Sequence, residues 1–135
     1  GFTSFSLNSN GYLIANSTAP TYTNWSTTNG TAGAFTADHD NDGVANGIEY
    51  FLGGNTNTTG TTSLPGVTNT SGTLSITWTK SSTYPGVYGT NFWIETTGTW
   101  TVETIGGNVV INGNAITYTF PSTGRRFARL KVVWP

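Results

Sequence analysis

Hydrophobic and polar residues alternate along the second half of the chain, from Thr73 onward. In T-L-S-I-T-W-T, Leu74, Ile76 and Trp78 share one face of a strand, and Ser and Thr residues share the other. Turn signals such as Y-P-G, I-G-G-N and N-G-N separate the segments at the spacing of an antiparallel sandwich. The other segments with this pattern are 91–95, 99–103, 108–112, 114–120 and 125–134. The pattern predicts an all-β fold, an antiparallel β-sandwich of Ig-like or jelly-roll-like type, with its main strands at 73–134.

Two short apolar segments stand near the start of the chain. Phe5 and Leu7 alternate with serines, as in a half-buried strand, and residues 12–15 form a second candidate strand. The S-N-G turn between the two segments suits a hairpin. We therefore expect segment 1–15 to carry strand structure, although a long stretch of chain separates it from the main strands.

The intervening chain is rich in Thr, Asn, Ser and Gly. Residues 16–36 predict a loop that Trp25 and Phe35 anchor in the core, and residues 55–72 predict a linker over the surface. We expect the whole chain, residues 1–135, to form a single domain.

One short helix is expected, in the segment N-G-I-E-Y-F-L-G-G. Ile48, Phe51 and Leu52 have the i, i+3, i+4 spacing of a helix face. Gly53 and Gly54 follow as residues that can end the helix. No other segment is predicted to be helical.

The composition fits a folded protein rather than a disordered one. The chain has 135 residues, enough for one domain, and aromatic residues make up 13 % of it. Charged residues make up only 8 %, and the net charge is −1. This balance disfavours nucleic-acid binding, which needs a basic surface. The apolar runs are also too short to span a membrane.

The residues that are absent indicate the compartment. Cys and Met both number zero, which suits an oxidising exterior where those side chains would be damaged. The chain begins at Gly1 with a polar, aromatic segment, as a processed mature protein would. We expect an extracellular or cell-surface location.

Four of the six acidic residues lie in the stretch D-H-D-N-D-G-V-A-N-G-I-E at 38–49. Counted from the first Asp, carboxylates occupy positions one, three, five and twelve, Gly is at six and Asn at nine, which is the spacing of an EF-hand calcium loop. The ligands expected from this spacing are Asp38, Asp40, Asp42, the carbonyl of Val44, and Glu49 with both oxygens. His39 and Asn41 fall at positions that should point outward.

Calcium is the expected ion because every proposed ligand atom is an oxygen, whereas Mg²⁺ prefers a smaller octahedral shell with more water. The alternative is an Asp- and Asn-rich turn that caps the helix. Residues 31–37 do not predict the first helix of an EF-hand, so the loop should act as a structural staple rather than a switch. Extracellular calcium modules bind at about 10⁻⁴–10⁻³ M.

The stretch A-D-H-D-N-D-G-V-A-N-G-I-E-Y-F-L-G-G resembles a calcium segment of secreted and surface proteins of environmental bacteria, which is similar to a thrombospondin type 3 repeat. In such proteins a β-rich region often follows, with a T-W pair and an R-R-F-x-R-L-x-V ending, as at 99–101 and 125–132 here. The resemblance covers roughly residues 35–133. It implies Ca²⁺ at the ligands named above, with Asn46 acting through water or in support of the ligands, and it implies no enzyme activity.

The residues for catalysis are few. The chain has no Cys, and its single His, His39, lies inside the acidic loop, so a thiol nucleophile and a Ser-His-Asp triad are not expected. Glu95 and Glu103 are the only acids outside the loop, and both fall on the polar faces of their strands, where they should be solvated. We expect no enzyme.

The five Trp residues suggest a binding role as one alternative. Trp78 and Trp100 alternate with Thr and should lie in the core. Trp93 and Trp134 could instead be exposed and stack on a sugar ring. Arg129 and Lys131 should line the outer face of the last strand or protect a sheet edge.

Self-assembly is the function that the sequence favours. A terminal strand can pair with its own sheet or with the exposed sheet edge of a neighbouring copy, and low charge density removes repulsion between copies. A head-to-tail contact of this kind builds an open fibre. The residues expected to make it are Phe2, Phe5, Leu7, Tyr12 and Ile14. A carbohydrate-binding or adhesive module, with glycans as partners, is the alternative.

Asn-x-Ser/Thr motifs mark candidate glycosylation sites. They occur at Asn16, Asn24, Asn29, Asn57 and Asn69. All five fall in segments expected to be loops, where glycans would be tolerated.

Overall fold

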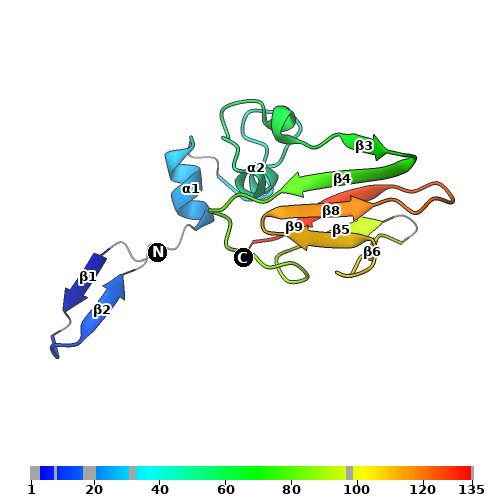
Figure 1. Ribbon diagram of the computed structural model, residues 1–135. Helices are drawn as coiled ribbons and strands as arrows, with labels where there is room; N and C mark the ends of the chain where they lie inside the picture. The colour runs from blue at the N-terminus through cyan, green and yellow to red at the C-terminus, as the bar shows by residue number, and fades with distance from the viewer. Residues whose placement is uncertain (1–3, 8, 17–20, 31–32, 97–98, 135) are drawn as a thin grey trace.

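The computed structural model describes residues 4–7, 9–16, 21–30, 33–96 and 99–134 (Figure 1). Its strands are β1 (Ser4–Leu7), β2 (Leu13–Asn16), β3 (Val67–Thr70), β4 (Thr73–Thr79), β5 (Phe92–Thr96), β6 (Thr101–Val102), β7 (Val109–Asn112), β8 (Ala115–Thr119) and β9 (Ala128–Val132). Its helices are α1 (Tyr22–Thr28), α2 (Asn46–Leu52) and the 3₁₀ turn η1 (Gly60–Ser63). The chain is thus mostly β with two short α-helices.

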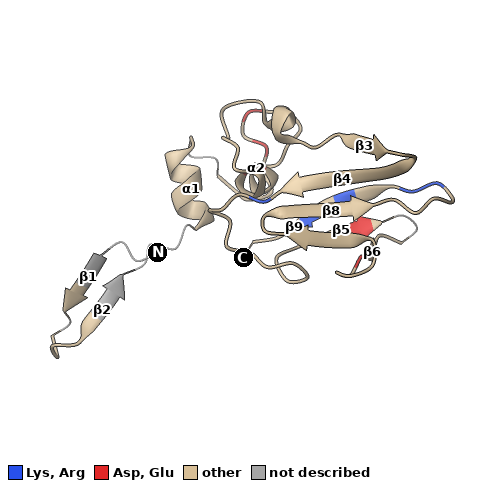
Figure 2. Cartoon of the chain, in the orientation of Figure 1, with Lys and Arg blue, Asp and Glu red and all other residues tan. Residues whose placement is uncertain are grey.

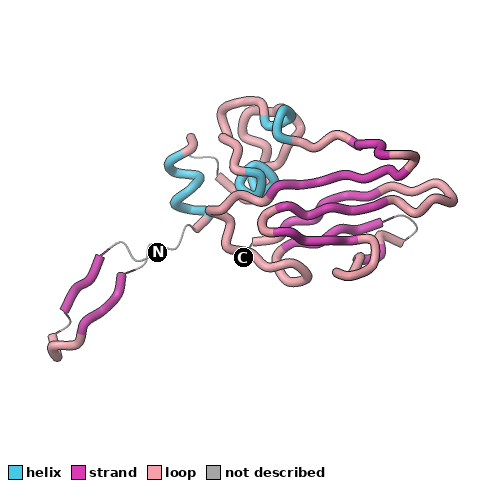
Figure 3. Tube along the Cα trace, viewed as in Figure 1, coloured by secondary structure: helices cyan, strands magenta, loops and turns pink. Residues whose placement is uncertain are grey.

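Two antiparallel sheets pack on one core, as in an all-β sandwich (Figures 1 and 3). One sheet has the strand order β3-β4-β8-β7 and the other has the order β6-β5-β9. Trp78, Ile116 and Tyr118 of the first sheet and Phe92 and Ile94 of the second are all buried in the shared core. The alternation seen in the sequence produces this core, because every second side chain of each strand faces inward.

The four-stranded sheet is wider than the sheet it packs on. Exposure of its inward face rises from β8 to β3: Tyr118 is 1 % exposed, Leu74 of β4 is 43 % exposed and Val67 of β3 is 59 % exposed. The register places Val67 opposite Ile76, so both side chains lie on the inward face of the sheet. The three-stranded sheet ends at β9 and leaves this part of the inward face uncovered.

Helix α1 contradicts the prediction of a loop over residues 16–36. Thr21 caps the helix by accepting a 3.2 Å hydrogen bond from the Asn24 N–H. Tyr22 and Ser26 are buried and Trp25 is half-buried, a helix face with i, i+3, i+4 spacing that a Thr- and Asn-rich composition obscured. Trp25 and Phe35 pack against the core, as expected.

Helix α2 begins at Asn46 and ends at Leu52, within the predicted segment. Gly53 has a φ of 79°, and the Gly54 N–H donates a 2.8 Å hydrogen bond to the Glu49 carbonyl, which closes the helix in a Schellman-type turn. The linker prediction for residues 55–72 was wrong in part. That stretch contains η1 and the strand β3.

The N-terminal hairpin forms as predicted. β1 and β2 pair antiparallel, with Leu7 opposite Leu13 and Ser4 opposite Asn16. Figure 1 shows this hairpin lying apart from the sandwich, beyond α1. Phe2, one of the predicted assembly residues, lies outside the described residues.

Candidate functional site

Three carboxylates converge in the loop before α2. Asp38, Asp40 and Asp42 each offer one oxygen atom, and these oxygens lie within 4.8 Å of one another. Two ligands on opposite sides of a Ca²⁺ ion lie about 5 Å apart, because each oxygen is about 2.3–2.6 Å from the ion. The spacing therefore matches a shared cation. Figure 2 shows this acidic loop beside α2 and η1.

The loop backbone is curled so that alternate side chains point inward. Asp38 accepts hydrogen bonds from the N–H groups of Asp42, at 3.2 Å, and Gly43, at 2.8 Å. Asn41 and Gly43 have φ angles of 58° and 90°, in the left-handed region that Gly and Asn tolerate best. The glycine at position six thus permits the sharp turn that the sequence predicted.

Glu49 is the fourth carboxylate, and it is only 1 % exposed. Within the described part of the chain, neither of its carboxylate oxygens has a hydrogen-bond partner, and the buried Asp40 Oδ1 lacks one too. Burial, followed by the charges of Asp40, Asp42 and Asp38, raises the pKa of Glu49 to about 7. A buried carboxylate that has no donor among the described residues, and that lies within the electrostatic influence of three other carboxylates, is costly unless a cation compensates the charges.

Gly60 completes the enclosure from a distant part of the chain. Its backbone N–H donates a hydrogen bond to Asp42 Oδ2. A Cβ atom at this position would lie 3.0 Å from Glu49 Oε1 and 3.5 Å from Asp42 Oδ2. Sequence analysis missed Gly60, because no local pattern links residue 60 to the loop.

Asn46 supports the loop with its side chain. Its Oδ1 accepts a 3.2 Å hydrogen bond from the His39 N–H, and its Nδ2 donates a 3.0 Å hydrogen bond to the Ala34 carbonyl. The backbone N–H of Asn46 also donates to the Ala37 carbonyl at 2.8 Å. Asn46 therefore ties the two ends of the loop together. His39 and Asn41 are exposed, as expected for positions that do not bind the ion.

The Val44 side chain is 4 % exposed, as expected for an apolar residue that faces inward. With Ile48 it forms part of one wall of an apolar groove of about 460 Å³. The opposite walls come from Ile76 and Trp78 of β4 and from Leu130 of β9. The acidic loop therefore borders both the candidate metal centre and an opening between the two sheets.

Glu95 was predicted to be solvated on the polar face of its strand, and this prediction was wrong. It is 8 % exposed and accepts a 2.8 Å hydrogen bond from Trp93 Nε1 and a 2.7 Å hydrogen bond from Arg129 Nε. The Trp93 and Arg129 hydrogen bonds, with the charges of Arg129 and Lys131, lower the pKa of Glu95 against the opposing effect of burial.

Trp100 was expected in the core and is instead 42 % exposed. It has a φ of 54° and precedes β6, so it does not follow the alternation of a strand. The Arg129 guanidinium lies over its ring, 3.8 Å from the centroid. The ring nitrogen of Trp93 is engaged by Glu95, so neither tryptophan is a simple exposed platform.

Trp134 is 47 % exposed and borders a shallow hollow of about 450 Å³ with Tyr22, Phe35 and Ser26. Its ring meets the Tyr22 and Phe35 rings edge-on, at interplanar angles of 90° and 86°. Trp134 therefore both packs on the aromatic core and offers part of its surface to solvent.

The glycosylation motifs do not all lie in loops, contrary to expectation. Asn16 lies in β2, Asn24 in α1 and Asn69 in β3. The amide nitrogen of Asn29 donates to the Trp25 carbonyl at 2.8 Å, and that of Asn57 donates to the Asn29 carbonyl at 3.3 Å. The amide oxygen of Asn69 accepts a 2.9 Å hydrogen bond from the Gly72 N–H, so at least three of the five candidate amides are engaged in hydrogen bonds.

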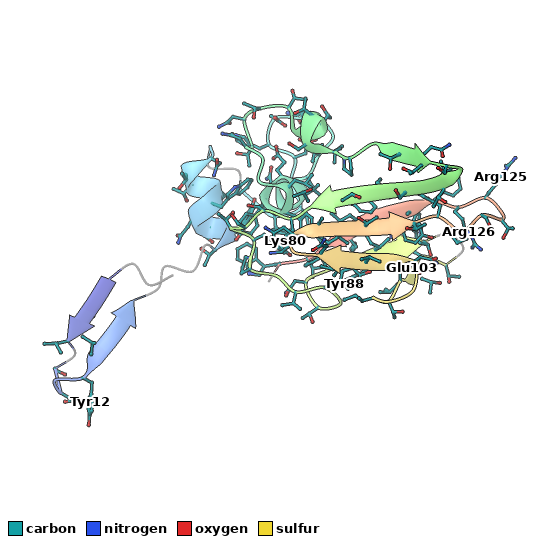
Figure 4. The ribbon with its side chains drawn as sticks, in the orientation of Figure 1. Tyr12, Lys80, Tyr88, Glu103, Arg125 and Arg126 are labelled. Atoms are coloured by element: carbon teal, nitrogen blue, oxygen red, sulfur yellow. The ribbon has the colours of Figure 1, made fainter. Side chains whose placement is uncertain are left out.

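The hairpin exposes large apolar side chains. Leu7 is 71 % exposed, Tyr12 is 70 % exposed and Leu13 is 68 % exposed. Phe5 lies in β1 and Ile14 in β2. Figure 4 places Tyr12 at the tip of the hairpin and Arg125 and Arg126 at the opposite end of the molecule.

Comparison of the chain with family models, with curated proteins and with solved structures finds no match. The resemblance to proteins with a thrombospondin-like calcium segment, which covers roughly residues 35–133, therefore stays a prediction. Among the described helices, none has the length and apolar character needed to cross a membrane.

Proposed function

We propose that this chain is an extracellular structural protein that assembles with copies of itself, and that the assembly proceeds head-to-tail by donation of the N-terminal strand segment. A calcium ion bound in the 38–49 loop holds the sandwich in the form that assembles. The observation that carries the proposal is the hairpin β1–β2, which lies apart from the sandwich with its leucines exposed (Figure 1).

The exposed hairpin is costly for a monomer. An isolated two-stranded hairpin is marginally stable in water, and burying a Leu side chain stabilises by about 1.5–3 kcal/mol. Leu7 and Leu13 are opposite one another and both largely exposed, so the hairpin supplies a ready apolar surface. Segment 1–20 also contains no charged residue, so no charge must be desolvated when it is buried.

Calcium is the ion that the donor set favours. All candidate ligand atoms are oxygens, and four carboxylates suit a hard cation with six to eight ligands. Asp38, Asp40, Asp42 and Glu49 would hold the ion, and the Val44 carbonyl is the fifth proposed ligand. Because Asp42 also accepts from Gly60, the ion would fasten the 55–65 region to the sandwich.

Of the two sandwich types expected from the sequence, the strand order favours the Ig-like type. Labelled in chain order, β3-β4-β8-β7 follows the A-B-E-D order of an Ig-like sheet, and β5-β9 corresponds to its C-F pair. In that fold the G strand pairs with strand F. Strand F corresponds to β9 here, so the position of G is the one beside β9. Among the described strands, β9 pairs with β5 alone.

The test compares two full-length variants by sedimentation velocity in millimolar Ca²⁺. The double variant Leu7→Ser, Leu13→Ser should lose the large species that the parent chain forms, with its thermal unfolding unchanged. Val87→Ser is the matched control, because Val87 is also exposed, at 62 %, but lies outside the hairpin. Equal assembly by both variants, or a parent chain that stays monomeric, would rule out the proposal.

A carbohydrate-binding or adhesive role is the second candidate, and the hollow beside Trp134 favours it. The half-exposed indole with the exposed Thr23 nearby is an arrangement that could stack on and hydrogen-bond to a sugar ring. A glycan array probed with the parent chain and with Trp134→Ala tests it. Loss of a specific glycan signal in the variant supports this role, and no signal from the parent excludes it.

A further inference from the structure

The edge of β9 lies next to an uncovered apolar surface. β9 pairs with β5 on one side, and no described strand pairs with its other side. An unpaired edge presents a row of backbone N–H and C=O groups that can accept another strand. Ile76 and Trp78 of β4 share a groove with Ala128 and Leu130 of β9. Farther along the same inward face, Val67 of β3 and Leu74 of β4 are exposed beside the segment that precedes β9.

Two hollows follow this edge. One is the groove of about 460 Å³ between β4 and β9, which the acidic loop closes at one end. The other, of about 250 Å³, lies between Val67, Leu74, Phe120 and Arg126. Both are lined by inward-facing residues of β3 or β4, so they mark the space that a further strand beside β9 would fill.

We propose that β9 is the acceptor edge and that β1 of a second copy adds to it, which names the docking site for the assembly proposed above and rests on that function. The donor would lie beside β9 with Phe5 and Leu7 turned toward the groove and Ser4 and Ser6 turned to the outer face. The alternation of β1 suits these surroundings, because Leu130 of β9 is half-buried on the groove side and Lys131 is exposed on the other.

The charges on β9 favour β1, rather than the β9 strand of a second copy, as the strand that adds to the β9 edge. Arg129 and Lys131 are both exposed on the outer face of β9. Glu95 compensates part of the Arg129 charge, but pairing two β9 edges would still add Lys131 of each copy to the same outer face, and like charges opposite each other destabilise a sheet. The hairpin carries no charge, so its addition to β9 meets no such repulsion. β1 and β9 also have similar lengths, of four and five residues.

The geometry suits addition from a separate molecule. The hairpin projects from one end of the protein, whereas Arg126, which lines the smaller hollow, lies at the opposite end (Figure 4). The end of the proposed acceptor surface that Arg126 marks therefore lies far from the molecule's own hairpin. Each copy would present a donor at one end and an acceptor along its other half, which is the condition for a chain of copies.

Disulfide trapping tests the docking site directly, because the natural chain has no Cys. A Ser6→Cys or Ser4→Cys variant is mixed with a Lys131→Cys variant under mild oxidation, and Val110→Cys on the edge strand β7 replaces Lys131→Cys as the control. The inference predicts a cross-linked product of twice the 14.3 kDa chain mass with Lys131→Cys and at least a tenfold smaller yield with Val110→Cys.

The possible outcomes separate this inference from the function on which it rests. Assemblies that form but give equal yields at both acceptor positions keep the assembly and overturn the β9 site. A cross-link within one chain, in a variant that carries Ser6→Cys and Lys131→Cys together, also overturns it, because the hairpin would then serve its own molecule. A second variant, Leu74→Ser, should abolish assembly with unchanged thermal unfolding, and unimpaired assembly by this variant would overturn the site as well.

Discussion

The backbone of Gly60 lies against the carboxylate of Glu49. A Cβ atom on residue 60 would be 3.0 Å from Glu49 Oε1, closer than side chains ordinarily pack. This contact joins α2 to a segment that sequence analysis treated as a surface linker. Among the described residues no donor reaches either oxygen of the Glu49 carboxylate, so a bound cation would compensate its buried charge.

Glu49→Gln should change stability in opposite directions with and without Ca²⁺. In Ca²⁺ the variant loses a charged ligand, and its affinity should fall by more than the roughly 10–100-fold that the loss of an outer-shell partner costs. In chelator at pH 8 the variant should unfold at a higher temperature than the parent, because the parent then buries an unpaired charge.

The raised pKa of Glu49 sets the direction in which stability changes with pH. Glu49 contributes stability below its unfolded pKa, near 4.5, and that contribution is lost as pH rises through about 7 in the cation-free protein. Calorimetry with and without Ca²⁺ measures both effects. Glu103→Gln is the control, because its amide oxygen can still accept the Thr96 hydroxyl hydrogen bond. A Glu49→Gln variant that is destabilised equally in both conditions would show that the residue has a structural role only.

Gly47 should not tolerate a methyl group. A Cβ at this position would lie 2.2 Å from the Phe35 ring, so Gly47→Ala must displace Phe35 or the start of α2. We expect a loss of about 1–3 kcal/mol in the free energy of unfolding.

Urea unfolding checks this cost against Gly66→Ala, where the added Cβ meets nothing within 4 Å. That control should stay within about 0.5 kcal/mol of the parent. Equal stability of the two variants would show that Phe35 does not hold the loop against α2.

Glu95 should make the free energy of unfolding sensitive to acid. Because the pKa of Glu95 is lowered in the folded protein, its contribution to stability is present above the unfolded pKa and is lost as pH falls through the folded pKa. Glu95→Gln should cost about 1 kcal/mol at pH 7, because Arg129 is half exposed and solvent screens the ion pair.

The cost of Glu95→Gln should shrink as the pH is lowered below the ordinary carboxyl range. Urea unfolding of the parent and the variant at a series of pH values measures the difference between them. A difference that stays constant across the series would mean that the Trp93 hydrogen bond, rather than the ion pair, sets the contribution of Glu95.

Local patterns predicted the parts of the fold in which sequence neighbours meet. The acidic spacing and the Gly53 cap are short-range features. The structure brings Asp38, Asp40 and Asp42 together and ends α2 at Gly53. Helix α1 was missed because Thr and Asn have low helix propensity, and here tertiary packing of Tyr22 and Trp25 outweighs it.

Long-range contacts could not be predicted from the same patterns. Gly60 reaches Asp42 across 18 positions, and Arg129 reaches Glu95 across 34. Trp100 has the polar neighbours of a strand residue but a left-handed backbone, which alternation does not reveal. The uncovered face of β3 and β4 depends on the relative widths of the two sheets, a property of the topology and not of any one segment.

Chelation should dismantle the assemblies, because Val44 of the acidic loop and Ile48 of α2 form part of one wall of the groove beside β9. Removing the ion leaves four carboxylates in mutual repulsion and should loosen that wall. Restoring Ca²⁺ should restore assembly, and Mg²⁺ should do so poorly, since it prefers a smaller shell with more water.

Electron microscopy of the purified full-length chain in Ca²⁺, before and after chelation, tests the central claim most directly. The account predicts filaments in Ca²⁺ that shorten or disappear in chelator and return when Ca²⁺ is added back. A chain that remains monomeric in Ca²⁺ at high protein concentration would contradict it.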